Sequence, residues 1–197
     1  MGLQQYKTLI LVIAVVAALF VASPAIEQIV IFPQTDSLTE LSIMGPYHNA
    51  TYPYNIVSNQ KTTLYLDVKN HVGSTALYLI DVKFRNQTQS APDSFNHTSS
   101  DQPALGQISF CVANNGTIEL PIDISFQYNV EANNETLSMQ NIIVNGAPLS
   151  TDTTIAWNPD NQGFYGNLFF ELYIFNDTTN TFQYNERFVS LWLKMNT

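Results

Sequence analysis

The sequence predicts an all-β domain, an immunoglobulin-like antiparallel β-sandwich preceded by one N-terminal hydrophobic helix. Three observations indicate this fold class: an apolar run near the N-terminus, short segments that alternate polar and apolar residues, and no helical apolar period after Ile26. A closed β-barrel is the competing arrangement of the same strands. We therefore divide the chain into a leader over residues 1–26 and one sandwich domain over residues 27–197.

The leader is predicted to be an export signal or a membrane anchor. Residues 9–22 form an uninterrupted apolar stretch that follows a short polar start carrying Lys7. With its flanking residues this stretch reaches the ~20 residues that cross a bilayer, and as an anchor it would hold the chain in the membrane. Residues 23–25, Ser-Pro-Ala, also have the small-x-small form of a signal-peptidase site, so cleavage near Ala25 would release a secreted chain. In both cases the chain after Ile26 is expected outside the cytoplasm.

Seven segments after the leader are predicted to be strands. They are rich in β-branched and aromatic residues, and most alternate apolar with polar positions. The segments are 38–44, 62–68, 77–84, 108–112, 118–130, 168–175 and 187–193. The break at 70–74 predicts a hairpin between the second and third segments, and Asn114-Asn115-Gly116 predicts a turn before the fifth. A polar loop over 176–185 joins the last two, and residues 86–103 form a predicted mobile insertion.

Two residues in these segments are predicted to lie in the core. Cys111 stands in the apolar run 108–112 and is expected to be a small buried residue. Trp192, between Leu191 and Leu193, is expected to be a large core or inter-sheet residue. Because the sequence has a single cysteine, an intrachain disulfide and a multi-thiolate metal site are excluded.

The charge of the chain excludes two kinds of partner. The formal net charge is −9, with seven Lys and Arg against sixteen Asp and Glu. A protein that neutralises phosphates of nucleic acid or of anionic lipid needs the opposite balance, so we expect no nucleic-acid binding. Only 12 % of the residues are charged. Solubility must therefore come from Asn, Thr, Ser and Gln, supplemented by attached sugars.

Six triplets fit the acceptor pattern for N-glycosylation, and all six carry Thr at the third position. Each lies between the predicted strands or at the end of one, where a bulky glycan can reach solvent without disrupting a β-ladder. The predicted glycosylation sites are Asn49, Asn86, Asn96, Asn115, Asn134 and Asn176.

The sequence predicts no catalytic, cofactor-binding or metal-ligating site. The three histidines, His48, His71 and His97, belong to no metalloprotease pair and to no Ser-His-Asp pattern. Carboxylates stand singly along the predicted strands, without a close pair that could serve as acid and base. Residues 158–163 and 177–180 offer oxygen atoms, but their spacing matches no calcium loop and predicts turns instead. We therefore expect no enzyme activity and no cofactor.

Motifs stand at both ends of the domain. TELSIMGP at 39–46 is followed by NATYP at 49–53 and LYLDVKNH at 64–71. Near the C-terminus stand LFFELYIF at 168–175 and YNERFVSLWL at 184–193. These motifs resemble the archaeal family catalogued as domain of unknown function 1616. The resemblance implies a domain outside the membrane, following hydrophobic helices, and implies no activity.

Together these observations predict a non-catalytic, glycosylated protein of an archaeal cell surface. Its expected partners are other envelope proteins or copies of itself, and the membrane through the N-terminal helix. The alternative is a subunit of an extracellular filament or pilus. In that case the β-prone segment 26–33 would complete the sheet of a neighbouring copy by donor-strand exchange. A third possibility, an enzyme or an accessory subunit of a membrane enzyme, rests on the topology alone and ranks below the other two.

Overall fold

The computed structural model describes residues 6–7, 11–13, 16–17, 38–93, 95–132 and 135–196. The chain divides into two units, Met1–Asp36 and Ser37–Thr197. In the first unit the described residues are helical and their side chains are exposed. Within the described residues no helix has the length and apolar character that crossing a bilayer requires. Much of the predicted leader helix, the cleavage site near Ala25 and the segment 26–33 lie outside the described residues.

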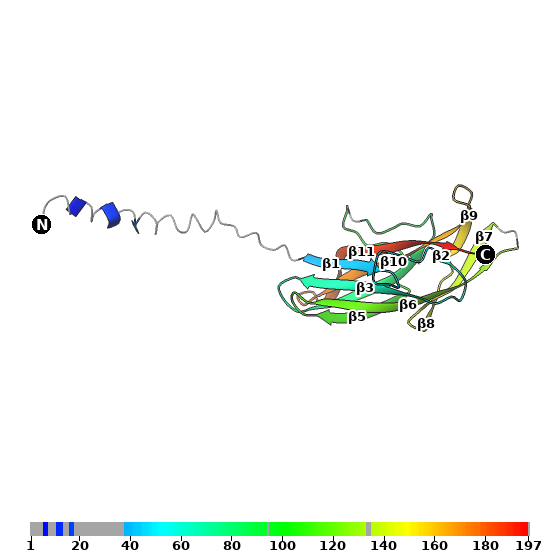
Figure 1. Ribbon diagram of the computed structural model, residues 1–197, viewed down its shortest axis with the longest axis horizontal. Helices are drawn as coiled ribbons and strands as arrows, with labels where there is room; N and C mark the ends of the chain where they lie inside the picture. Colours follow the sequence, from blue (N-terminus) through cyan, green and yellow to red (C-terminus); the bar gives the residue numbers. More distant parts are fainter. Residues whose placement is uncertain are drawn as a thin grey trace. The chain divides into compact units, whose positions relative to one another are not determined.

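The second unit is built mainly of strands, which confirms the predicted all-β class (Figure 1). Seven of the strands match the predicted segments, and six of these extend beyond the predicted bounds. Four strands, β2, β7, β8 and β9, were not predicted. The strands are β1 Leu38–Met44, β2 Asn55–Ile56, β3 Thr62–His71, β4 Ala76–Arg85, β5 Gly106–Val112, β6 Thr117–Val130, β7 Thr136–Val144, β8 Ala147–Ser150, β9 Thr154–Asn158, β10 Gly163–Asn176 and β11 Thr181–Met195.

The strands of the described chain form one continuous, curled sheet. Its path runs β1-β3-β6-β7-β9-β10-β11-β2, while β4 pairs with β10 and β5, and β8 pairs with β7. Strand β9 joins the two halves of this path. Its residues 154–156 pair with β7, whereas Trp157 and Asn158 pair with β10. One half of the sheet is therefore β1, β3, β6 and β7, and the other is β5, β4, β10 and β11.

The hydrophobic core contains side chains from both halves of the sheet. On β3, Leu64, Leu66 and Val68 are fully buried and alternate with half-buried residues, as the period of two for a strand requires. Phe126 on β6 contacts Phe84 on β4, with ring centroids 6.2 Å apart. Because these two strands belong to different halves, their contact shows that the halves pack against each other across the core.

The connection between β3 and β4 is a corner between the two halves, so the predicted hairpin is wrong. Strand β3 pairs with β1 and β6, whereas β4 pairs with β5 and β10. The buried side chain of Asn70 holds this corner: its Nδ2 donates to the carbonyls of Ser74 at 2.8 Å and Val112 at 2.9 Å. Its Oδ1 accepts from the Val72 N–H at 3.0 Å and the Tyr78 hydroxyl at 3.1 Å. These bonds satisfy the backbone where the chain leaves one half for the other.

The predicted insertion over 86–103 packs partly against the second half of the sheet. Ser100 is buried, and its backbone N–H donates to the Oε1 atom of Glu171 on β10 at 2.7 Å. Pro92 in the same segment is also buried. This contact helps to explain why β10 is buried on both faces from Gly163 to Leu172.

Cys111 is exposed, so the prediction of a buried thiol is wrong. Strand β5 pairs with β4 and has no other strand partner among the described residues. Along β5 the buried position is Val112, and the alternation of a strand turns the preceding residue toward solvent. The apolar run 108–112 therefore lies at an edge and not in the middle of the core.

Gly166 on β10 allows close packing against Phe84, and this gives a stability prediction. A Cβ atom at residue 166 would lie 2.2 Å from the ring Cζ of Phe84. We expect Gly166→Ala to lower the free energy of unfolding by about 1–3 kcal/mol, the usual cost of an overpacked core. Urea denaturation followed by circular dichroism measures this loss. In combination with Phe84→Leu the loss should be smaller than the sum of the two single losses, and strict additivity would contradict the contact.

Candidate functional site

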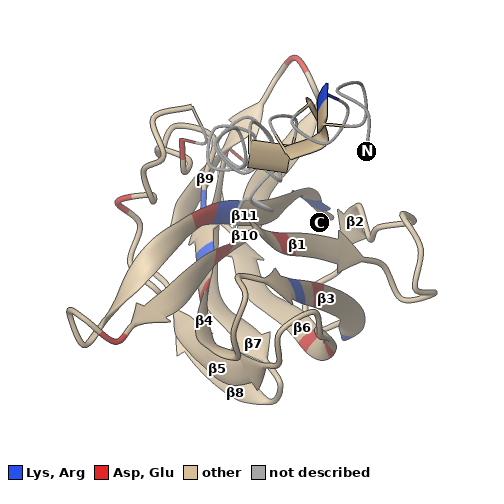
Figure 2. Ribbon diagram, turned by 90° about the vertical axis from the view of Figure 1, so that its left-hand side faces the viewer, with Lys and Arg blue, Asp and Glu red and all other residues tan. Residues whose placement is uncertain are grey.

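Charged residues are scattered along the strands and loops of the second unit (Figure 2). At the surface, Lys61 and Asp123 form an ion pair at 2.6 Å, and Lys69 and Glu40 form one at 3.5 Å. The hydrogen bond and charge of Lys61, with a hydrogen bond from the Thr63 hydroxyl, lower the pKa of Asp123. These exposed pairs contribute little to stability, and they do not form a concentrated charge that would attract an ionic ligand.

The described acceptor asparagines all lie in loops, in turns or at the end of a strand. Asn49, Asn96 and Asn115 are exposed, whereas Asn86 and Asn176 are half-buried. Asn134 lies outside the described residues. In three triplets, those of Asn49, Asn86 and Asn176, the asparagine Oδ1 accepts the backbone N–H of the threonine two residues later. This is the Asx-turn, which asparagine forms readily.

The three histidines lie in different contacts. His48 is 3.0 Å from Glu119 and stacks on the ring of Tyr65. The Nδ1 atom of His71 lies 3.0 Å from the Oδ1 atom of Asn115, and His97 is 2.9 Å from Glu186. No group of three His, Cys, Asp or Glu side chains in the described part of the chain is placed to hold a metal ion.

A buried polar cluster lies under the segment between β4 and β5. The Nζ atom of Lys83 is 2.7 Å from the Oε2 atom of Glu171 and also donates to Ser100. The Tyr173 hydroxyl donates to the same Oε2 atom at 2.9 Å. Burial and this carboxylate raise the pKa of Tyr173, and burial raises the pKa of Tyr184 to about 12. Because Lys83 and Glu171 are closed off from solvent, we assign the pair to stability.

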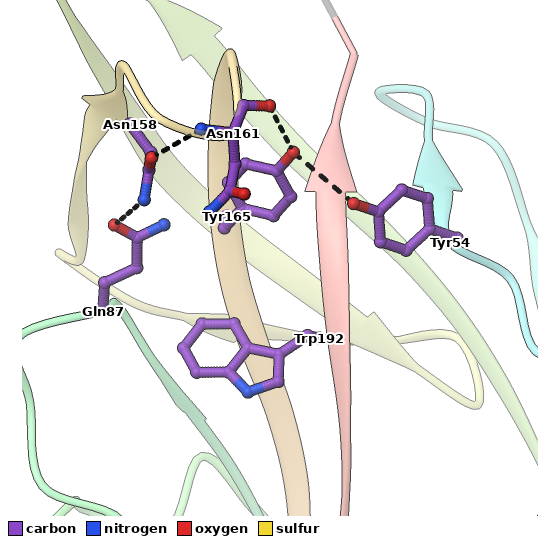
Figure 3. A pocket seen from close by; sticks show the side chains of 6 residues that line it. All are labelled: Tyr54, Gln87, Asn158, Asn161, Tyr165 and Trp192. Atoms are coloured by element: carbon purple, nitrogen blue, oxygen red, sulfur yellow. Dashed lines mark hydrogen bonds between the residues drawn. The ribbon is translucent and has the colours of Figure 1, made fainter.

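A pocket of about 460 Å³ lies beside β10 and β11 (Figure 3). Its described lining consists of three aromatic side chains and three side-chain amides from distant parts of the sequence. The residues are Tyr54, Gln87, Asn158, Asn161, Tyr165 and Trp192.

Strand pairing and loop contacts bring these six residues together. The pairing of β11 with β2 places Tyr54 beside the end of β11, where its carbonyl accepts the Lys194 N–H at 2.8 Å. The β9–β10 hairpin, which pairs residues 158 and 163, presents Asn158 and Asn161 on its turn. The loop after β4 is attached to β9 because the Nδ2 atom of Asn86 donates to the Thr154 carbonyl at 2.9 Å. The next residue in that loop, at position 87, lines the pocket.

Hydrogen bonds hold most of the pocket side chains in place (Figure 3). The Tyr54 hydroxyl donates to the Tyr165 hydroxyl at 3.4 Å, which donates to the Asn161 carbonyl at 2.8 Å. The bond to Tyr165 raises the pKa of Tyr54. Asn158 accepts the Asn161 N–H at 2.9 Å and donates to Gln87 at 3.2 Å. The turn predicted over 158–163 is confirmed by this bonding.

Trp192 is 42 % exposed and lines the pocket, so its prediction as a core or inter-sheet residue is wrong. The guanidinium of Arg85 lies 4.9 Å from the centroid of the Trp192 ring. Arg85 is itself fixed, because its Nε donates to Asn167 at 3.0 Å and its Nη1 to the Gln89 carbonyl at 2.7 Å. A cation at this distance attracts the aromatic ring and restrains its orientation.

Comparisons with known proteins supply no residue of this site. No family model matches the sequence, and no curated protein matches it. Among solved structures, the chain is similar to the CARDB domain of a Pyrococcus furiosus protein in complex with di-metal ions. That match has 9 % identity and a TM-score of 0.37, and covers 81 % of this chain and 89 % of that one. A β-glucosidase of Listeria innocua in complex with glucose matches at 7 % identity and a TM-score of 0.39, over 82 % of this chain and 16 % of the enzyme.

Proposed function

We propose that this chain is a non-catalytic glycoprotein of an archaeal cell surface that acts by binding other envelope proteins or copies of itself. The leader would hold it in the membrane or, after cleavage near Ala25, release it. Three features support the proposal: the apolar stretch over 9–22, the six acceptor triplets, and the resemblance of both ends of the domain to domain of unknown function 1616.

We infer further that the curled sheet is an immunoglobulin-like sandwich. Strands β1, β3 and β6 in one half and β5, β4, β10 and β11 in the other follow the order of such folds, and the core lies between the halves. The links from β3 to β4 and from β5 to β6 both cross from one half to the other. The path of described strands ends at β1 and at β2, which supports a sandwich over a closed barrel because a barrel has no free edge.

The placement of the acceptor asparagines carries the proposal. Each of the five described ones lies where an attached glycan would not break a strand pairing. They also differ in a way that can be tested. The Nδ2 atoms of Asn49 and Asn115 have no hydrogen-bond partner in the described chain, whereas those of Asn86 and Asn176 donate to Thr154 and Gln183.

We expect mass spectrometry of the native protein to find the highest glycan occupancy at Asn49 and Asn115, and lower occupancy at Asn86 and Asn176. The reason is that a glycan attaches to Nδ2, which is exposed and unbonded at the first two sites and engaged at the other two. Thr51→Val should remove the glycan at Asn49 alone, because it removes the hydroxyl of that triplet. Unmodified asparagines on a protein recovered from the cytoplasm would contradict the proposed function.

A filament subunit is the second candidate, and the sheet edges favour it. Within the described residues β1 pairs with β3 alone, and β11 pairs with β10 and, at Lys194 and Met195, with β2. Near this edge the Arg187 Nε atom of β11 donates to the Thr39 carbonyl of β1 at 3.2 Å. Neither strand has a further strand partner among the described residues, so an added strand could pair with them. Deletion of 26–33 should then abolish surface filaments in electron micrographs. Filaments that persist without this segment would remove the candidate.

A further inference from the structure

We propose that the pocket beside β10 and β11 binds a neutral carbohydrate. A sugar ring has faces of C–H groups, which pack on aromatic rings, and a rim of hydroxyl groups, which donate and accept hydrogen bonds. The described lining offers both kinds of partner: the rings of Tyr54, Tyr165 and Trp192, and the amides of Gln87, Asn158 and Asn161 (Figure 3). The pocket volume of about 460 Å³ falls within the range of about 300–1,000 Å³ for small-ligand sites.

The lining favours a neutral ligand over an ionic one. None of the described residues that line the pocket carries a charge. Arg85, whose guanidinium lies 4.9 Å from the Trp192 ring centroid, does not line the pocket and directs its Nε and Nη1 atoms to Asn167 and the Gln89 carbonyl. A phosphate or a carboxylate is bound tightly through charge-assisted hydrogen bonds, which this wall does not offer.

Several donors in the pocket are unused. The Nε2 atom of Gln87, the side-chain amide of Asn161 and the Nε1 atom of Trp192 have no hydrogen-bond partner in the described part of the chain. The groups around them are already fixed, because Asn158 donates to the Gln87 oxygen and Tyr165 donates to the Asn161 carbonyl. Free donors on a fixed frame are suited to the hydroxyl groups of a ligand, since little side-chain freedom is lost on binding.

Trp192 provides the platform on which a sugar face would pack. The residue is 42 % exposed. The Arg85 guanidinium, 4.9 Å from the centroid of the Trp192 ring, restrains the orientation of the ring. The other tryptophan, Trp157, is also 42 % exposed but does not line the pocket, and it packs edge-on against Phe164 at 5.2 Å. The chain therefore contains its own matched control.

The test is a titration of the full chain, produced without N-glycans and kept in detergent. The neutral probes are methyl glucoside, methyl mannoside and N-acetylglucosamine, and the charged probes are glucuronic acid and glucose 6-phosphate. Calorimetry measures Kd, and tryptophan fluorescence of a Trp157→Phe variant, in which Trp192 is the remaining tryptophan, reports contact with the pocket. We expect at least one neutral probe to bind and to change this fluorescence. Binding of none of them, or tighter binding of a charged probe, would overturn the proposal.

Variants locate the binding site. Trp192→Ala is expected to raise Kd about tenfold, which corresponds to about 1.4 kcal/mol. Gln87→Ala, a change in an exposed loop, should also weaken binding, and it keeps the test decisive if Trp192→Ala fails to fold. Trp157→Ala should leave Kd within about twofold, as expected of a residue outside the site. Equal losses in the Trp157 and Trp192 variants would overturn the assignment.

Two sources share this ligand chemistry: a glycan on another copy of the chain, and a free polysaccharide of the surroundings. If copies are the source, the glycosylated protein self-associates and the bound methyl sugar reverses it, whereas the glycan-free protein stays dispersed. If a polysaccharide is the source, both forms bind the sugar and neither self-associates. Sugar binding rests on the proposed surface function, because it names what that surface protein would recognise, but either proposal can fail without the other. If no sugar binds, the proposed surface location is still tested by the glycan occupancy at Asn49 and Asn115.

Discussion

Replacing Glu171 by glutamine is expected to lower the free energy of unfolding by about 3–5 kcal/mol, the usual cost of breaking a buried ion pair. Glutamine keeps the shape of the side chain but removes the charge that lies 2.7 Å from the Lys83 Nζ atom. Lys83 is 4 % exposed and Glu171 is 0 % exposed, so the remaining ammonium group would be buried without the carboxylate that is hydrogen-bonded to it. Urea denaturation of the full chain, followed by circular dichroism, measures the change.

An exposed ion pair serves as the control for this prediction. Glu40 lies 3.5 Å from Lys69 at the surface, and Glu40→Gln should cost no more than about 1 kcal/mol. The double replacement Lys83→Met and Glu171→Leu should recover much of the stability lost in Glu171→Gln, because it leaves no unpaired charge. If Glu171→Gln proves as mild as Glu40→Gln, the pair does not stabilise the fold in the way described.

Asn70→Ala is the second substitution with a large expected effect, a loss of about 3 kcal/mol or more in the free energy of unfolding. The side chain is fully buried and makes hydrogen bonds with the carbonyls of Ser74 and Val112, the Val72 N–H and the Tyr78 hydroxyl. Removing it leaves these groups without their partner, and the bonds to Val112 and Tyr78 are buried. Thermal and urea unfolding give the loss, and hydrogen exchange should show faster opening of the β3–β4 corner.

The matched control for Asn70→Ala is an asparagine that is exposed within a strand. Asn129 on β6 fits this description, and Asn129→Ala should change stability by no more than about 0.5 kcal/mol. A comparable loss in both variants would show that the hydrogen bonds of Asn70 are not the cause.

Strands with one face against the core were predictable because their buried residues recur at every second position. Strand β6 illustrates this, with Ile122, Ile124 and Phe126 buried. Strand β7 was missed because its alternation is interrupted: Leu137 and Met139 are buried, and then Ile142 and Val144. The register with β6 shifts at a bulge opposite Gln127, which leaves an extra residue in β7. A bulge reverses the inward and outward positions and so hides the period of two.

The pocket was not predictable as a whole, because its residues are far apart in the sequence and meet through the pairing of β11 with β10 and β2. One signal for it was present, however. Leu191 and Leu193 are buried, and a residue between two inward positions of a strand must point outward. The same alternation that predicted the strand therefore indicated that Trp192 lies on the outer face.

Because Cys111 is exposed on an edge strand, oxidation of its thiol can reveal how copies of the protein associate. The chain has one sulfhydryl group, and it lies exposed on β5, a strand with one neighbour among the described residues. Copies that paired along this edge with the two Cys111 residues opposite each other would bring their thiols together, and mild oxidation would trap them as covalent pairs on a non-reducing gel. Copies that associated through β1 and β11 would form no disulfide and would run as single chains on the same gel. A native cross-linking handle thus distinguishes two modes of association without altering any residue.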